Sequence, residues 1–234
     1  KFCSALAGLP KHREQKTTMS IKQWIALAAA LSSSSVALAS TTDITVTGVI
    51  RPGACTPSLS GGGVFDFGVI TPDQLARFGQ TQFRSPAQQL NVQCDAPTRF
   101  ALRAVDNRAG SASWAPGSPI AFGLGQHKGN LIGAYFIQTV ASSYVADGSS
   151  SVRRLVTSDS GATWQPDGNS AFSHIYNGAA GRFHGFAVGA DVPTAIRHLS
   201  TDLQIDMRLN SLVALSVADD IPIDGASTLE VTYL

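Results

Sequence analysis

The chain has 234 residues, of which 44% are hydrophobic and 14% are charged, and its formal net charge is +1. This balance is compatible with a packed core, and it gives no basic footprint of the kind that nucleic-acid-binding domains carry.

The first residues indicate export. Met19–Lys22 carries one positive charge, Trp24–Leu31 is an apolar run, and small residues precede a cleavage point between Ala39 and Ser40. The apolar run is far shorter than the roughly 20 residues that a membrane-spanning helix needs. We therefore expect a signal peptide over residues 19–39 and no membrane insertion of the mature chain. Residues 1–18 are interpreted as sequence upstream of the true start.

The mature chain, residues 40–234, would form a single domain of 195 residues. Its twelve basic and fifteen acidic residues give a net charge of −3. One lysine, Lys128, and one glutamate, Glu230, are few for a protein with exposed helix faces, which these residue types normally furnish. The abundance of Gly, Ser, Thr and Asp favours short strands and turns instead.

Strands are predicted at short intervals along the mature chain. Ile44–Ile50 alternates apolar and polar residues, as a half-buried strand does. The clearest strand is Asp202–Leu209, of which one face is expected to be core and the other to lie in water. The other predicted strands are residues 64–70, 90–94, 99–105, 131–140, 153–156, 171–176, 182–188, 211–217 and 228–234, with a short helical turn at 71–75. Such closely spaced strands favour an all-β antiparallel sandwich.

Cys55 and Cys94 are the two cysteines of the exported part. In an oxidising compartment they should form a disulfide. Closing a loop of about 40 residues would stabilise the fold by roughly 4 kcal/mol. The alternative is a pair of free, buried thiols.

Two resemblances follow from these features. The order of signal peptide, alternating strand, Cys55, Phe67–Gly68, Cys94 and penultimate Tyr233 resembles the subunits of chaperone-usher pili. Residues 44–57, 94–98 and 106–110 are similar to a family of uncharacterised, fimbrial-like exported proteins of Gram-negative bacteria. This second likeness spans nearly the whole mature chain.

The pilin resemblance implies an immunoglobulin-like sandwich that lacks one strand, so that a partner fills its apolar groove with a strand of its own. The implied partners are a periplasmic chaperone, an usher and neighbouring fibre subunits, and the implied location is the periplasm, the cell surface or a fimbrium. The residues carried over are Leu229, Val231 and Tyr233 beside the groove, and Ile44, Val46, Gly48 and Ile50 as the strand given to a neighbour. The mature chain has only 15 residues before Cys55, which is short for a donor arm. Alternatively, both end strands pair within a complete sandwich.

No motif predicts catalysis, and no cofactor or metal is expected. Residues 157–164 are similar to the aspartate-box hairpin of sialidases, in which Asp159 and Thr163 would tie a turn together above Trp164. A sialidase propeller needs several such boxes, so the single copy here predicts a structural turn. Asp202 and Asp206 would lie about 13 Å apart along their strand, too far for a glycosidase pair. His127, His174, His184 and His198 lack a zinc spacing, and Asp219, Asp220 and Asp224 are interpreted as a solvated loop rather than a calcium site.

Two functions from different classes therefore remain. The first is a structural subunit or tip component of a surface fibre. The second is a self-complete secreted sandwich that binds a ligand such as a sugar through the long loop at residues 110–130. In that case Trp114, Phe122 and His127 would supply stacking contacts, and the alternative for these rings is ordinary packing.

Overall fold

The computed structural model describes residues 44–49, 53–114, 116–168 and 171–234. It separates into two units, residues 1–49 and residues 50–234, which are described one at a time. In the first unit, residues 44–49 form neither helix nor strand, and Ile44, Val46 and Val49 are exposed. The predicted half-buried strand is therefore wrong for residues 44–49, because alternation makes a strand only where a partner strand is available. Ile50, the signal peptide, its cleavage site at Ala39 and Ser40, and residues 1–18 lie outside the described residues.

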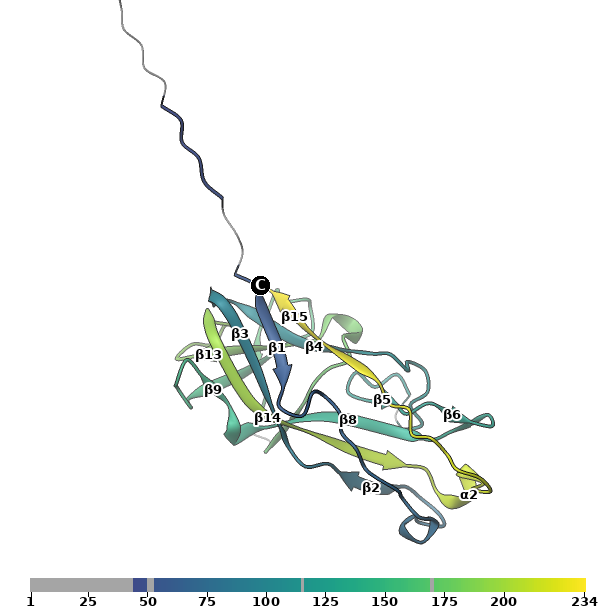
Figure 1. Cartoon of the computed structure of the whole chain (residues 1–234). Coiled ribbons are helices and arrows are strands. Elements are labelled where there is room, and N and C mark those ends of the chain that lie inside the picture. The colour runs from purple at the N-terminus through teal and green to yellow at the C-terminus, as the bar shows by residue number, and fades with distance from the viewer. Residues whose placement is uncertain (1–43, 50–52, 115, 169–170) are drawn as a thin grey trace, which may run out of the picture. The chain divides into compact units, whose positions relative to one another are not determined.

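The second unit is an antiparallel β-sandwich, which confirms the predicted all-β class (Figure 1). The first sheet has the order β1 (Cys55–Leu59), β3 (Gln88–Thr98), β14 (Ile196–Leu209), β8 (Gly133–Val140) and β12 (Phe172–His174). Three further strands join it: β2 (Thr81–Arg84) and β9 (Val145–Ala146) pair with β14, and β5 (Phe122–Gly123) pairs with β8.

The second sheet has the order β11 (Gln165–Pro166), β10 (Val152–Thr157), β13 (Phe183–Val188), β4 (Phe100–Asp106) and β15 (Ser227–Tyr233). A small hairpin of β6 (Gln126–His127) and β7 (Asn130–Leu131) stands apart from both sheets. The helical elements are short: η1 (Pro72–Gln74), η2 (Ala141–Ser143), η3 (Ala179–Gly181) and α2 (Leu212–Leu215). No helix of the described residues has the length and apolar character to cross a membrane.

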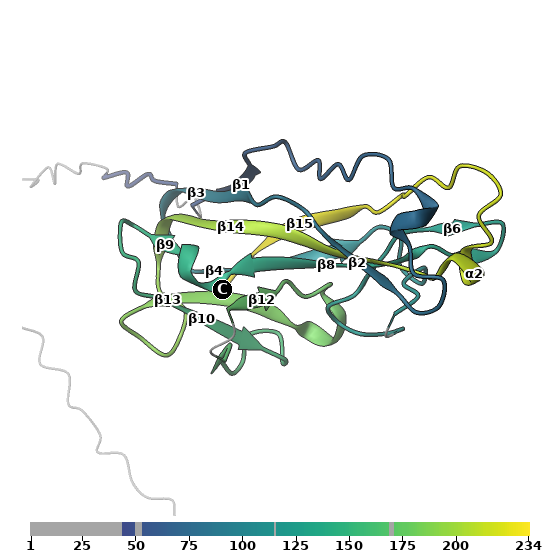
Figure 2. The ribbon, with the colours of Figure 1, turned by 90° about the horizontal axis from the view of Figure 1, so that it is seen from below.

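The core fills the space between the two sheets. Figure 2 shows β3 and β14 in one layer and β13 and β10 in the other. Alternate residues of each strand point inward, so that Phe100 and Phe186 of the second sheet meet at 6.0 Å between ring centroids. Leu90 and Leu199 of the first sheet are 1% exposed.

The predicted disulfide is confirmed, since Cys55 is bonded to Cys94. The two residues are direct partners in the antiparallel ladder of β1 and β3. The bond therefore fixes the edge strand β1 to its neighbour at the start of the sandwich.

Two further predicted strands, in the second unit, are wrong. Residues 64–70 are not a strand, because Gly68 has a positive φ of 63° and donates its N–H to the Asp66 side chain at 2.8 Å, which makes a local turn. Residues 211–217 contain the helix α2, because the hydroxyl of Ser211 accepts a hydrogen bond from the Ala214 N–H and caps a helical turn.

Candidate functional site

The second sheet ends in a strand with a free edge. β15 pairs with β4 along its whole length, from Ser227 opposite Asp106 to Tyr233 opposite Phe100. Within the described part of the chain, no strand pairs with the other side of β15. The backbone groups on that side are therefore a template to which a further strand can be added.

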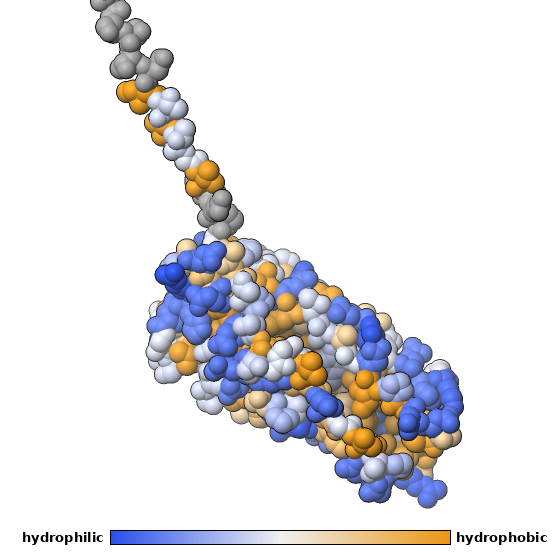
Figure 3. All heavy atoms as spheres, viewed as in Figure 1, coloured by the Kyte–Doolittle hydropathy of each residue, from blue (hydrophilic) through white to orange (hydrophobic). Residues whose placement is uncertain are grey.

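An apolar hollow of about 850 Å³ adjoins the segment that leads into β15. Residues 65–72 form one wall and residues 217–223 form the other. Its apolar lining comprises Phe65, Phe67, Val69, Ile70, Leu75, Ile132, Leu209, Leu215, Val217, Ile221 and Ile223. Figure 3 shows apolar residues at the surface on this face of the molecule. We call the free edge of β15 together with this hollow the open seam.

At the end of the open seam that lies next to the disulfide, a hydrogen bond joins β1 to β15. The N–H of Cys55, at the start of β1, donates a hydrogen bond of 2.9 Å to the Tyr233 hydroxyl on β15. Of the three predicted groove residues, Leu229 and Val231 are partly buried against the core, whereas Tyr233 is 50% exposed and links the two sheets. The structure therefore brings all three to the edge strand and gives Tyr233 a different place from the other two.

The charged side chains that line the hollow are all acidic: Asp66, Asp219 and Asp220. Asp219 forms an ion pair with Lys128, which extends from the loop between β6 and β7. An apolar hollow with acidic side chains suits an apolar segment that carries a positive charge.

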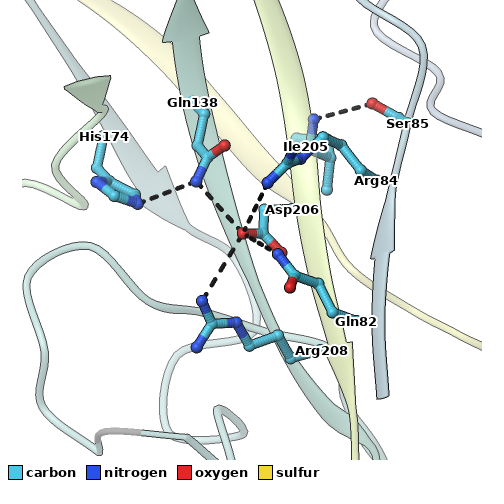
Figure 4. A network of polar contacts seen from close by, with 8 residues as sticks. All are labelled: Gln82, Arg84, Ser85, Gln138, His174, Ile205, Asp206 and Arg208. Carbon is cyan, nitrogen blue, oxygen red and sulfur yellow. Dashed lines mark hydrogen bonds and ion pairs between the residues drawn. The ribbon is translucent and has the colours of Figure 1, made fainter. Parts of the chain in front are cut away.

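A second group of side chains, which sequence reasoning missed, lies on the outer face of the first sheet (Figure 4). At its centre is Asp206 of β14, which is 2% exposed. The Gln82 amide donates hydrogen bonds of 2.8 Å to both carboxylate oxygens, and the Gln138 amide donates one of 3.4 Å. The guanidinium groups of Arg84 and Arg208 lie 4.0 Å and 3.8 Å from the same carboxylate. We call the following residues the Asp206 cluster: Gln82, Arg84, Gln138, His174, Asp206 and Arg208.

Strand register brings the Asp206 cluster together. Asp206 lies opposite Arg84 on β2, while Gln138 on β8 lies opposite both Gln204 and His174. The prediction that this face of β14 lies in water is wrong at Asp206 and Gln204, which are buried. Side chains from neighbouring strands, such as Gln82 and Gln138, lie against this face of β14. The sequence of β14 itself does not indicate these neighbours.

A further polar group is buried on β13. His184 is 1% exposed, its ring stacks on Tyr176 at 4.7 Å, and its Nδ1 lies 3.8 Å from the Asp167 carboxylate. Burial lowers the pKa of His184 to about 4, and the charge of Asp167 offsets only part of this effect. The imidazole is therefore neutral at pH 7.

The aspartate-box turn has the predicted geometry. Asp159 accepts hydrogen bonds from the Thr163 N–H at 2.9 Å and from the Thr163 hydroxyl at 2.6 Å. The Trp164 indole donates to the Gly161 carbonyl at 3.1 Å. Hydrogen bonds from Thr157 and Thr163 lower the pKa of Asp159 to about 2. These contacts tie one turn together and describe a structural element.

The three aromatic residues of the long loop are separated in the structure. Phe122 is fully buried and stacks on Tyr135 at 5.3 Å, so the prediction that it contacts a ligand is wrong for this ring. His127 lies in the β6–β7 hairpin. Trp114 is half-buried and packs edge-on against Phe136 at 5.1 Å, next to Arg208 of the Asp206 cluster.

The acidic loop before β15 is tied to basic side chains. Asp224 accepts two hydrogen bonds of 2.8 Å from the Arg108 guanidinium, which lowers the pKa of Asp224. Across the described ranges, no three His, Cys, Asp or Glu side chains converge in an arrangement suited to a metal ion.

Comparison with known proteins gives two matches. The family described as "Protein of unknown function (DUF1120)" matches residues 44–141, a range that includes the disulfide and the strands β1 to β8. Protein GltF of Escherichia coli (strain K12) is 30% identical over 225 residues, which cover 82% of this chain and 88% of that protein. These matches confirm the expected likeness to a domain family without an assigned function.

Proposed function

The chain belongs to the same family as Protein GltF, and its residues 44–141 match the DUF1120 domain; from this premise we propose that it is an exported structural subunit or tip component of a chaperone-usher-type surface fibre. In this proposal the subunit is assembled by β-strand complementation. It needs no cofactor and catalyses no reaction. The observation that carries the proposal is the open seam, which combines the free edge of β15 with the apolar hollow beside the segment that leads into this strand.

Strand complementation would satisfy two needs of the open seam at once. A strand laid beside β15 would pair with its free backbone groups, and its inward-facing side chains would cover the apolar walls of the hollow. Leu229 and Val231, which are only partly buried, would gain contacts along the same edge. The bound segment should have apolar residues at every second position, because a strand points alternate side chains to one face.

The occupant should also carry a basic residue. Asp66, Asp219 and Asp220 line the hollow, and Lys128 faces only one of them. In the proposed assembly, strands of this kind come from a periplasmic chaperone and then from a neighbouring subunit, after delivery to an usher. Ile44, Val46, Gly48 and Ile50 are the proposed donor residues of this chain, and Arg51 follows them directly.

The location proposed for the subunit is the periplasm, the cell surface or a fimbrium. The Cys55–Cys94 bond supports this proposal, because disulfides form and persist in oxidising compartments and are rare in the cytosol. The predicted signal peptide over residues 19–39 would direct the export.

The first test adds a strand to the isolated subunit. A synthetic peptide with the sequence of residues 43–51 should raise the urea midpoint of the mature chain, because it binds only the folded state. The variants Val217→Asp and Ile223→Asp place a charge in the hollow at positions that are 39% and 38% exposed, and should abolish the rise without unfolding the chain. The matched control Val192→Asp, at an exposed position that does not line the hollow, should still show the rise in urea midpoint when the peptide is added.

The second test is periplasmic expression of the chain with and without its cognate chaperone. We expect a higher yield of soluble subunit when the chaperone is present. A chain that is soluble, monomeric and cooperatively folded by itself, and whose urea midpoint is unchanged by the peptide, would contradict the missing-strand proposal.

The second candidate function is a self-complete sandwich that acts as a secreted binding module. One observation favours it. Trp114, which belongs to the loop predicted to bind a sugar, lies beside the Asp206 cluster on the face of the first sheet that is turned away from the core. This placement is compatible with a tip component as well as with an independent module.

A further inference from the structure

We propose that the Asp206 cluster, together with Trp114 and Phe172, binds a saccharide that carries a carboxylate group. The inference rests on the binding function named above as the second candidate and is independent of strand acceptance, because these residues lie on β2, β8, β12, β14 and a loop rather than at the open seam.

The cluster holds more positive charge than its own carboxylate neutralises. Arg84 and Arg208 flank Asp206 at 4.0 Å and 3.8 Å, distances longer than hydrogen bonds, while the amides of Gln82 and Gln138 supply the hydrogen bonds to the carboxylate. Within the described part of the chain, neither guanidinium donates a hydrogen bond. Each guanidinium has five N–H donors, and an external carboxylate is the partner that matches their planar geometry.

The exposed fractions show which groups a ligand meets first. The side chains of Arg84 and Arg208 are 47% and 31% exposed, whereas that of Asp206 is 3% exposed. An approaching anion therefore meets two guanidinium groups, and the buried Asp206 carboxylate holds them in place without itself reaching solvent.

Aromatic rings fix the orientation of both guanidinium groups. Arg84 lies over Phe172 at 5.3 Å, and Arg208 lies over Trp114 at 4.8 Å and over Phe136 at 5.0 Å. A guanidinium that stacks on a ring keeps the N–H groups at its edge free for a planar anion. Trp114 and Phe172 are half-buried, so part of each ring remains accessible to the apolar face of a sugar.

The remaining polar groups suit hydroxyl groups, which both donate and accept hydrogen bonds. The Gln138 amide is a donor, so the Nε2 of His174, 3.2 Å away, must accept, and the ring proton of His174 is on Nδ1, available to a ligand oxygen. Burial lowers the pKa of His174 and keeps this neutral form. Two buried amide atoms, Gln138 Oε1 and Gln204 Nε2, have no hydrogen-bond partner among the described residues. Unpaired buried polar atoms are rare and costly in folded proteins, so these two amides are unmet hydrogen-bonding groups next to the cluster.

The test uses a trisaccharide of galacturonic acid as the probe and its full methyl ester as the uncharged comparison, in titration calorimetry with the mature chain. We expect the acid to bind and the ester to bind at least roughly tenfold more weakly, because a charge-assisted pair is lost. Arg84→Gln, at a half-exposed position, should weaken binding of the trisaccharide acid by a similar factor. Arg197→Gln removes the same charge from an exposed position at the far end of β14 and should leave binding unchanged.

Three results would overturn the inference. They are no binding of the acid at about 10 mM, equal binding of the acid and the ester, and equal weakening by Arg84→Gln and Arg197→Gln. The hollow variants Val217→Asp and Ile223→Asp should bind the trisaccharide as the parent does. A failure of strand acceptance is thereby distinguished from a failure of saccharide binding.

Discussion

At the scale of single residues, the two buried polar centres of the sandwich differ in how their charge is balanced. The carboxylate of Asp206 lies next to amide donors and two arginines. His184 is held against Tyr176 by packing, and burial keeps its imidazole neutral. Protonation of His184 would place a cation in a site that excludes water, which is costly unless the charge is paired.

We therefore expect His184 to make stability dependent on pH. The pKa of His184 is 6.5 in the ordinary, solvated state and about 4 in the folded protein. Above pH 6.5 both states hold the neutral ring, so His184 adds no pH dependence. Between pH 6.5 and about 4 the unfolded chain binds a proton that the folded chain does not, so the free energy of unfolding falls as the pH falls.

The variant His184→Phe checks this expectation, because it keeps a flat ring against Tyr176 and removes the titration. Urea unfolding at pH 7 and pH 5 should show a smaller loss of stability in the variant than in the parent. An equal loss in both proteins would show that other groups cause the dependence.

At the scale of elements, the edge strands decide where the sheet edge is held by bonds and where it lacks a pairing partner. β1 is five residues long and, within the described ranges, pairs with β3 alone, yet the disulfide and the Tyr233 hydroxyl fix its first residue. The chain that follows β1 leaves the sheet at Leu59 and reaches the hollow without forming a strand. The edge formed by β1 and the residues after Leu59 is therefore fixed by the disulfide at its start, and the segment after Leu59 forms no strand.

Removal of the disulfide should consequently weaken the whole unit. The double variant Cys55→Ala, Cys94→Ala should lose roughly 2 to 4 kcal/mol of unfolding free energy in urea, because the unfolded chain regains the freedom of the closed loop. Mass spectrometry of the parent purified from the periplasm should find the two sulfurs oxidised. Free thiols in that material would contradict both the bond and the proposed oxidising location.

At the scale of the whole 50–234 unit, backbone protection should be uneven. β14 pairs with β3, β8, β2 and β9, so its amides lie inside the sheet. Among the residues that the structure describes, β15 pairs only with β4, and residues 64–70 belong to no strand. Local opening costs least where few groups are paired and buried.

Hydrogen exchange measured by mass spectrometry should follow this difference. We expect slow exchange in β14, faster exchange in β15 and residues 64–70, and slowing in those two segments when the peptide of residues 43–51 is bound. The variant Val192→Asp should repeat the parent pattern. Exchange in β15 that is as slow as in β14, without any partner strand, would mean that the edge is already covered.

Features that depend on neighbours along the chain were predictable. The predicted strands at residues 99–105, 131–140, 182–188, 202–209 and 228–234 correspond to β4, β8, β13, β14 and β15. The pairing of Cys55 with Cys94 was also predictable, as was the turn of Asp159 and Thr163, which lie four residues apart. Where a local signal was misread, a competing local contact decided the outcome. The Asp66–Gly68 turn and the Ser211 cap replaced two predicted strands with irregular and helical structure.

The sequence by itself thus determined the all-β class, the covalent link and the family. The tertiary structure alone decided which strand edge stays free, which rings enter the core, and which side chains form the Asp206 cluster. The physical reason is strand register: Gln82 and Asp206 are 124 residues apart, and they meet only because β2 pairs with β14 in one alignment. Polar residues at every second position of β14 show that one face of the strand is polar, but they do not show whether water or other side chains, such as Trp114 and its neighbours, lie against that face. Only the folded chain decides this.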